Sequence, residues 1–190
     1  DYAPDYNYYM SDLTRQWPVN GKFSKEQREL YNFYLACYRA IAKRIRPGVT
    51  ASQITKEAYS EMEEIFLDYK FSKKIYNDGA ARFIESFKKR GDRPYTMLGH
   101  WVGMSTHDVG GYKDIVFEPG MVFTIEPQFV IPEEKIYIRI EDLFVITETG
   151  AEMVSSFVPD DIEEIEALMK NDGILQQYPA YNEMKEKLRN

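Results

Sequence analysis

Both histidines of this 190-residue chain, His100 and His107, lie in one short segment, MLGHWVGMSTHDVGGY. Imidazole is the commonest metal ligand in proteins and can carry protons near neutral pH. The glycines around the two histidines would let the backbone approach a site closely, although they are also typical of turns. The segment is therefore a candidate for chemistry, set against the commoner role of a single histidine as a satisfied core or surface residue.

Two glutamates in apolar stretches are the next candidates. Glu126 comes near the end of GMVFTIEP, and Glu141 lies among the isoleucines of KIYIRIEDLFVIT. A carboxylate in such surroundings is costly to bury unless something pairs with it. Arg139 is predicted on the same strand face as Glu141 and could be that partner. A metal ion is the other candidate.

The N-terminal segment adds three aspartates, Asp1, Asp5 and Asp12, among several tyrosines. Each of them alone would be interpreted as a surface residue. Because both histidines and several strand carboxylates fall in segments that otherwise have the pattern of a core, their combination favours a functional site.

Composition limits the class of protein. The chain is 44% hydrophobic and 15% aromatic, which excludes disorder and favours one globular domain over residues 1–190. With 24 basic and 31 acidic residues, the net charge is −7. A surface of this charge should repel nucleic acid and anionic membranes. The single cysteine, Cys37, cannot form an internal disulfide and is expected to be buried.

Hydrophobic periodicity predicts alternating helices and strands. The helices are expected within 23–48, from about 52 to 67, within 79–91 and within 160–173, and the tail from 174 to 190 has no clear pattern. In the first helix Ser24 is the expected N-cap, Gln27 completes a capping box, and Pro47 and Gly48 form the stop. Its core face is predicted to comprise Leu30, Phe33, Tyr34, Cys37, Ile41 and Ile45.

Strands are predicted at 120–127 and 135–147, which are rich in β-branched and aromatic residues. In the second strand Tyr137, Arg139 and Glu141 should share one face, with isoleucines on the other. The stretch 129–137 is predicted to form a hairpin with its turn at 132–134.

Four stretches together resemble one known family: YMSDLTRQWPVNGKFSKEQRELYN, GHWVGMSTHDVGGY, EPGMVFTIEP and IRIEDLFVITETGAE. In this order they are similar to the aminopeptidase P and prolidase family of pita-bread-fold metallopeptidases, which cleave Xaa-Pro bonds. The methionine aminopeptidases share that fold but resemble this chain less well. The resemblance implies an α+β, pita-bread catalytic domain.

The resemblance also implies roles for individual residues. The metal ligands would be Asp1, Asp12, His100, Glu126 and Glu141, with Asp12 and Glu141 bridging two ions. His107 would contact the substrate and donate to the developing oxyanion, and Arg139 would contact the substrate beside the ligands. Glu126 would also carry the proton to the leaving nitrogen.

The implied cofactor is a pair of divalent ions. Four carboxylates supply about −4, which offsets two divalent ions at about +4. Oxygen donors with one imidazole suit Mn²⁺ best, and Zn²⁺ or Co²⁺ are further candidates. Two such ions, roughly 3.5 Å apart, would lower the pKa of water held between them.

Two positions depart from the family pattern. Thr96 stands where many members have a histidine, and Gln128 where the residue after the IEP motif is often glycine. Both are expected near the substrate channel, so they bear on specificity more than on metal binding.

The expected function is removal of an N-terminal residue before proline. The alternatives are a prolidase-type dipeptidase and a catalytically silent pita-bread module used for binding. The partner would be a peptide or dipeptide with proline in second position, and a cytoplasmic location is favoured.

The chain is further expected to be the C-terminal part of a longer catalytic domain, so that Asp1 is not its native start. A strand before Asp1 and an upstream substrate histidine are expected. Without them, we expect 1–190 to be dimeric, to associate with a separate upstream segment, or to aggregate, with little peptidase activity.

Overall fold

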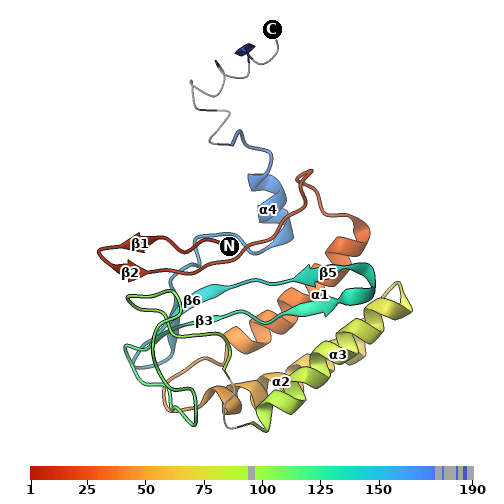
Figure 1. Ribbon diagram of the computed structural model, residues 1–190. Helices are drawn as coiled ribbons and strands as arrows, with labels where there is room; N and C mark the ends of the chain where they lie inside the picture. Colours follow the sequence, from red (N-terminus) through yellow and green to blue (C-terminus); the bar gives the residue numbers. More distant parts are fainter. Residues whose placement is uncertain (94–96, 174–176, 178–182, 184–185, 188–190) are drawn as a thin grey trace.

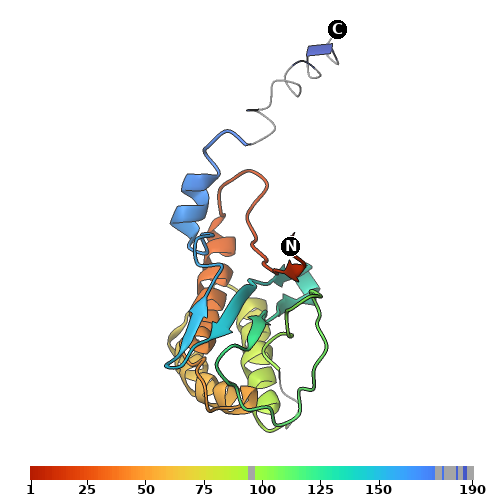
Figure 2. The same ribbon diagram turned by 90° about the vertical axis from the view of Figure 1, so that its left-hand side faces the viewer.

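The computed structural model describes residues 1–93, 97–173, 177, 183 and 186–187. Three long helices, α1 (Lys25–Ala42), α2 (Ala51–Asp68) and α3 (Lys74–Gly91), form a layer on one side of the strands (Figures 1 and 2). A short helix, α4 (Ile162–Leu168), follows the last strand. In the described part of the chain, no helix is both long and apolar enough to cross a bilayer.

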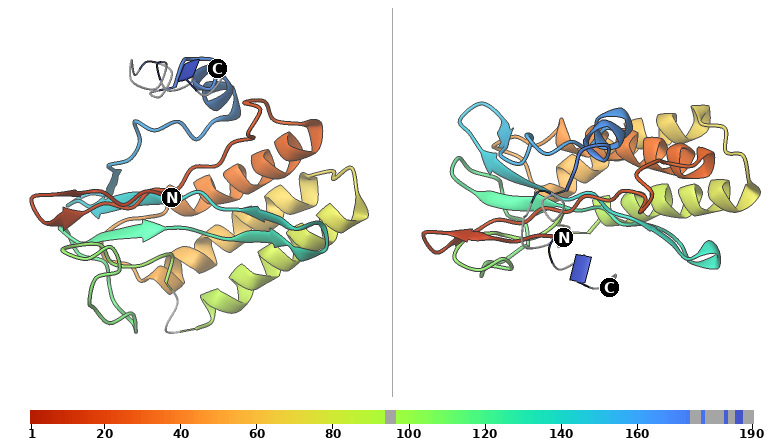
Figure 3. Two further views of the ribbon diagram at one scale, coloured as in Figure 1. Left: turned by 45° about the horizontal axis from the view of Figure 1, so that its top comes forward. Right: turned by 90° about the horizontal axis from the view of Figure 1, so that it is seen from above.

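The strands form three small antiparallel units. β3 (Val122–Ile125), β6 (Asp142–Ile146) and β7 (Ala151–Met153) make one sheet in the order β3-β6-β7. β4 (Phe129–Ile131) and β5 (Ile136–Ile138) make a hairpin around the 3₁₀ turn Pro132–Glu134. β1 (Asp5–Tyr6) and β2 (Tyr9–Met10) make a second hairpin. The amide of Met10 donates to the Gly103 carbonyl at 2.8 Å, and in both views of Figure 3 the red hairpin lies at the same end of the molecule as the green loops.

The core lies between the helices and the strands. All of the residues predicted for the core face of the first helix are buried, including Cys37, which is 0% exposed. Phe33 packs edge-on against Phe129 of β4. The Tyr34 hydroxyl donates to the carbonyl of Pro127 at 2.7 Å and accepts from the amide of Ile140 at 2.7 Å. α1 therefore fixes the strand segments that carry the candidate glutamates.

The first helix begins as predicted but ends earlier. The capping box of Ser24 and Gln27 is present. The predicted stop at Pro47 and Gly48 is wrong, because α1 ends at Ala42. The amides of residues 44 and 45 bond to carbonyls three residues back, so the chain leaves α-helical geometry before it reaches the proline.

Two other helices differ from their predicted limits. α3 begins at Lys74, and Gly79, the predicted start, lies inside it. A Cβ at Gly79 would lie 2.7 Å from Ile131, so this glycine permits close packing against β4 and does not mark a helix end. α4 is shorter than the predicted 160–173 and is capped by the Asp161 side chain. Most of the tail from 174 and Thr96 lie outside the described residues.

The predicted strand at 135–147 is two strands, β5 and β6. They separate because β5 pairs with β4 whereas β6 pairs with β3 and β7. The predicted hairpin at 129–137 is confirmed. β1, β2 and β7 were not predicted. Asn7 and Tyr8 adopt positive φ angles of 51° and 72° in the first hairpin turn, a position where glycine is the usual signal.

Candidate metal centre

The end of the β3-β6 pair brings the two candidate glutamates together. The last registered pair is Ile125 with Asp142, so Glu126 and Glu141 stand opposite each other one residue further along. Like charges directly opposite on neighbouring strands are destabilising. A cation between the two carboxylates would remove that repulsion.

His100 reaches the same place because its segment runs beside β3. The amide of Thr124 donates to the His100 carbonyl at 2.9 Å, and the amide of Glu126 donates to the carbonyl of Leu98 at 3.1 Å. A Cβ at Gly99 would lie 2.4 Å from the Thr124 carbonyl oxygen. Only glycine allows this approach, so the close backbone approach expected from the sequence is found at this position.

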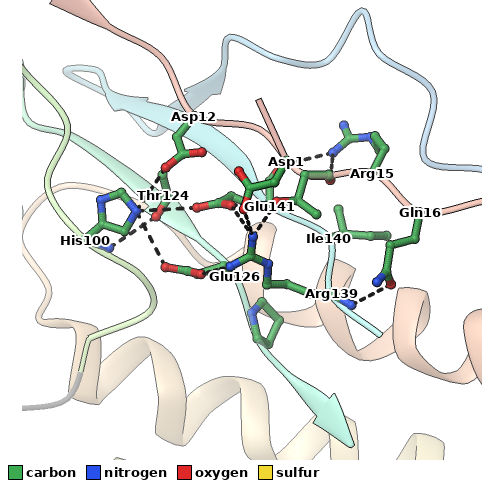
Figure 4. Close-up of polar contacts among 12 residues, drawn as sticks. Asp1, Asp12, Arg15, Gln16, His100, Thr124, Glu126, Arg139, Ile140 and Glu141 are labelled. Atoms are coloured by element: carbon green, nitrogen blue, oxygen red, sulfur yellow. Dashed lines mark hydrogen bonds and ion pairs between the residues drawn. The ribbon is translucent and has the colours of Figure 1, made fainter. Parts of the chain in front are cut away.

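The N-terminal segment adds its aspartates from the other side. Thr14 and Glu141 form an antiparallel bridge, and their amides and carbonyls exchange hydrogen bonds of 3.2 Å in both directions. The bridge places Asp12, which is 5% exposed, beside Glu141. Asp1 lies nearby and is exposed, whereas Asp5 is exposed on β1 and outside the group. Figure 4 shows Asp1, Asp12, His100, Glu126 and Glu141 facing one another, and these five residues are called the carboxylate cluster below.

The His100 ring faces three carboxylates. Its Nε2 atom lies 3.3 Å from Asp12 Oδ2, 3.6 Å from Glu126 Oε1 and 3.5 Å from Glu141 Oε1. Its Nδ1 atom lies 3.1 Å from the carbonyl of Trp101. A carbonyl can only accept, so Nδ1 carries the hydrogen of this bond. With the hydrogen on Nδ1, Nε2 of the neutral ring presents a lone pair to the carboxylate oxygens, and a cation bound between them would stabilise this arrangement.

Arg139 supplies positive charge on the opposite side of the cluster. Its guanidinium lies 2.9 Å from Glu126 Oε2 and 3.4 Å from Glu141 Oε2, and it donates to Asp1 Oδ2. It also donates to the Thr14 hydroxyl at 2.8 Å, and that hydroxyl donates to Glu141 Oε2 at 2.9 Å. Of the two partners considered for Glu141, arginine is therefore present, and the other oxygen of Glu141 remains for a second cation.

Arg139 alone does not satisfy the cluster. Among the described residues, the buried side-chain atoms without a hydrogen-bond partner are Asp12 Oδ1 and Glu141 Oε1. Burial first, and then the charge of Glu126, raise the pKa of Glu141 above its ordinary value of 4.5. Unpartnered buried carboxylate oxygens are costly, so the cluster has the electrostatics of a site built for added positive charge.

The geometry fits divalent metal ions. Three overlapping groups each offer ligand atoms within 4.8 Å of one another: Asp12 with His100 and His107, His100 with Glu126 and Glu141, and Asp1 with Asp12 and Glu141. Asp12, His100 and Glu141 each belong to two of these groups. Shared carboxylates are what adjacent ions require, and the donor set of oxygens with imidazole is the one that Mn²⁺ and Zn²⁺ accept.

His107 lies at the edge of the cluster. Its ring centroid is 4.0 Å from that of His100, but the residue is exposed whereas His100 is 7% exposed. The structure thus places both histidines at one site. The exposed one is on the side from which a substrate could approach.

Three neighbours of the cluster were not among the candidates from the sequence: Thr14, Arg15 and Asp142. Thr14 contacts both Glu141 and Arg139, as described above. Strand alternation could have identified Asp142 as a buried residue on the face opposite Glu141. Arg15 could not be found this way, because its segment has no strand pattern.

Gln128, the departure from the family pattern, lines a cavity of about 340 Å³ beside the cluster. Glu126, Gly99, Arg90 and Arg93 also line it. Gln128 thus lines the same cavity as Glu126, where it could contact a substrate side chain.

Comparison with known proteins identifies the class of metallopeptidases to which the chain belongs. The chain matches metallopeptidase family M24 over residues 1–148. It is 38% identical over 182 residues to the Xaa-Pro aminopeptidase of Escherichia coli (strain K12), covering 89% of this chain and 40% of that protein. It is 36% identical over 175 residues to the mitochondrial intermediate cleaving peptidase 55 of Arabidopsis thaliana, covering 86% of this chain and 32% of that protein.

A solved structure extends the likeness to three dimensions. Zinc-substituted E. coli aminopeptidase P in complex with product superposes with a TM-score of 0.65 at 38% identity, covering 86% of this chain and 39% of that chain. The chain belongs to metallopeptidase family M24 and has its α+β, pita-bread fold, as the sequence predicted. It spans 40% or less of the length of the two curated relatives named above.

Proposed function

We propose that this chain carries the dinuclear metal centre of a peptidase that cleaves the bond between an N-terminal residue and proline. The observation that supports the proposal is the convergence of Asp1, Asp12, His100, Glu126 and Glu141, with one buried oxygen of Asp12 and one of Glu141 left unpartnered. Asp12 and Glu141 would bridge two divalent ions, of which Mn²⁺ suits the donor set best and Zn²⁺ or Co²⁺ are alternatives. When bound, the ions would polarise the scissile carbonyl and lower the pKa of water.

The residues of the chain itself would orient and protonate the substrate. Glu126 is partly exposed and keeps one oxygen, Oε1, on the cluster side, so it can accept a proton and deliver it to the leaving prolyl nitrogen. His107 would donate a hydrogen bond to the developing oxyanion. Arg139 would keep Glu126 oriented and contact the substrate beside it.

The relatives support the choice of aminopeptidase over dipeptidase. The E. coli protein is named an Xaa-Pro aminopeptidase, and no feature of the described cluster favours a dipeptide. A catalytically silent module is disfavoured because none of the five predicted ligand positions has been replaced by a residue that cannot bind metal.

Elemental analysis tests the metal centre. After Mn²⁺ loading and removal of free metal, we expect about two ions per chain. Glu141→Ala should lose both ions, since Glu141 bridges, and His100→Ala should lose one. Asp5→Ala is the matched control, because Asp5 is in the same N-terminal segment but outside the cluster. Trace metal only in the unmodified chain would contradict the proposal.

A matched pair of peptides tests the substrate. In a preparation of the protein at its native length, a peptide with proline in second position should be cleaved much faster than its alanine counterpart. Equal rates would instead identify a general aminopeptidase, and Gln128 would be the first position to examine.

A further inference from the structure

A buried ion pair lies directly behind the carboxylate cluster. Arg15 Nη2 is 2.6 Å from Asp142 Oδ1, and the two side chains are 6% and 0% exposed. The proposed chemistry uses neither residue. A pair held this far from water is costly to form, so its place in the fold calls for a physical reason.

Side-chain alternation explains why the pair is behind the cluster. Glu141 and Asp142 are consecutive in an extended segment, so their side chains point to opposite faces. Asp12 and Thr14 face the cluster, and Arg15 follows Thr14 and faces away (Figure 4). Each of the two paired segments therefore places one group in the cluster and the next one behind it.

Asp142 holds Arg15 in a fixed position. Besides Arg15, it accepts from the hydroxyls of Tyr38 and Ser155, both at 2.5 Å. Burial and the charge of Asp142 raise the pKa of Tyr38, so its phenol remains a donor. Both oxygens of Asp142 are thus occupied. Arg15 is held further by Val158, whose carbonyl accepts from Nη2 at 3.0 Å.

Of the other two nitrogens of Arg15, Nε donates to the carbonyl of Pro159 at 3.0 Å, and Nη1 contacts the backbone beside the cluster. Nη1 donates to the carbonyls of Thr14 and Glu141, both at 3.0 Å. These carbonyls belong to the two residues that join the aspartate segment to the glutamate strand, and their mutual hydrogen bonds are long, at 3.2 Å. One guanidinium therefore holds both sides of the bridge that sets the separation of Asp12 and Glu141.

We propose that Arg15, fixed by Asp142, is a positioning residue that clamps the Thr14–Glu141 bridge and thereby sets the spacing of the metal-binding carboxylates. The expected change in Mn²⁺ affinity rests on the proposed function. The expected change in amide exchange at the Thr14–Glu141 bridge does not. Groups that orient metal ligands from behind usually change metal affinity by about 10–100-fold when they are replaced.

The experiment compares three variants of the protein at its native length. Arg15→Met keeps the length of the side chain without its charge, and Arg15→Lys keeps the charge without the fork that reaches two carbonyls. Met62→Ala is the control for lost stability, because Met62 is 0% exposed on α2, which contributes no side chain to the cluster. Amide hydrogen exchange is measured without metal, and Mn²⁺ affinity is measured by titration calorimetry.

In Arg15→Met the amides of Thr14 and Glu141 should exchange at least about tenfold faster relative to the amides of β6, and Mn²⁺ should bind about 10–100-fold more weakly. Arg15→Lys should recover part of both losses. Met62→Ala should lower the melting temperature without changing the Mn²⁺ affinity or the exchange ratio, which is the exchange rate of the Thr14 and Glu141 amides divided by that of the β6 amides.

Unchanged exchange at Thr14 and Glu141 in folded Arg15→Met would overturn the proposal. So would a loss of affinity in Met62→Ala as large as that in the arginine variants. Should Arg15→Met fail to fold, Arg15→Lys decides by the same two readouts. If the unmodified chain binds no Mn²⁺, the proposed function fails, while the exchange ratio still decides the role of Arg15.

Discussion

Glu141 and Asp142 are neighbours in the chain and are both buried, at 1% and 0% exposure, yet their surroundings are opposite. Asp142 has a donor on each oxygen, from Arg15, Tyr38 and Ser155. Glu141 has one oxygen without a hydrogen-bond partner, 3.5 Å from His100 Nε2, and lies beside Asp12 and Glu126. Two consecutive residues therefore differ in one respect: every oxygen of Asp142 has a hydrogen-bond donor, whereas one oxygen of Glu141 has none.

The difference separates a structural carboxylate from a candidate ligand. Burial alone does not distinguish them, because both side chains have lost their water. A buried carboxylate whose oxygens are all paired contributes to the folded state. A buried carboxylate with an unpartnered oxygen, opposite a second glutamate and beside an imidazole, is costly to the folded state, and a bound cation would lower that cost.

Replacing Asp142, the carboxylate with a donor on each oxygen, should have the largest effect on stability. In Asp142→Ala the buried charge of Arg15 is left unpaired, so we expect the free energy of unfolding to fall by about 3–5 kcal/mol. Urea unfolding in the presence of a chelator measures it. Glu57→Ala is the control, since Glu57 forms an exposed pair with Arg46 and should cost about 1 kcal/mol or less. Similar losses of unfolding free energy in Asp142→Ala and Glu57→Ala would show that the buried pair contributes no more than the exposed one.

Adding metal should stabilise the chain through Glu141, the carboxylate with an unpartnered oxygen. Mn²⁺ at a hundredfold excess over its Kd should raise the free energy of unfolding by about 2.7 kcal/mol. Glu141→Gln should abolish this rise, because the bridging charge is lost, whereas Asp5→Asn should retain it. Urea unfolding with and without Mn²⁺ measures both. An equal rise in Glu141→Gln would show that the ion binds elsewhere.

The two histidines should respond differently to replacement. His107→Ala should keep its metal and lose about 10²-fold in kcat/KM, which is about 2.7 kcal/mol of transition-state stabilisation. His100→Ala should lose metal. Elemental analysis and steady-state kinetics on the protein at its native length measure the pair. Metal loss in His107→Ala would make His107 a ligand, and normal activity would remove its proposed role.

The smallest effect concerns pH. Because the pKa of Glu141 is raised in the folded state, the folded chain holds that proton more tightly than the unfolded chain. Its contribution to stability is greatest below the ordinary pKa of 4.5 and falls as pH rises through the raised value. Without metal, Glu141→Gln should therefore gain stability relative to the unmodified chain between acidic and neutral pH. A difference that does not change with pH would contradict the raised pKa.

Much of the fold could be predicted from local sequence signals. The capping box of Ser24 and Gln27, the apolar face of α1 and the hairpin around residues 132–134 each depend on residues close together in the chain. The C-terminal end of α1 and the start of α3 could not be predicted this way, whereas α3 does end at Gly91 as predicted. α3 continues through Gly79 because Ile131, far along the chain, packs against it.

The candidate site also has features that the sequence predicted and features that only the tertiary structure shows. From the sequence by itself, residue types and the resemblance of the ordered motifs to a known family predicted the five candidate metal ligands. Tertiary structure decided how those residues meet: the approach of Gly99 to Thr124, the opposition of Glu126 and Glu141, and the bridge from Thr14. It alone revealed Arg15, since a guanidinium that binds carbonyls from two distant segments leaves no periodic mark in the sequence.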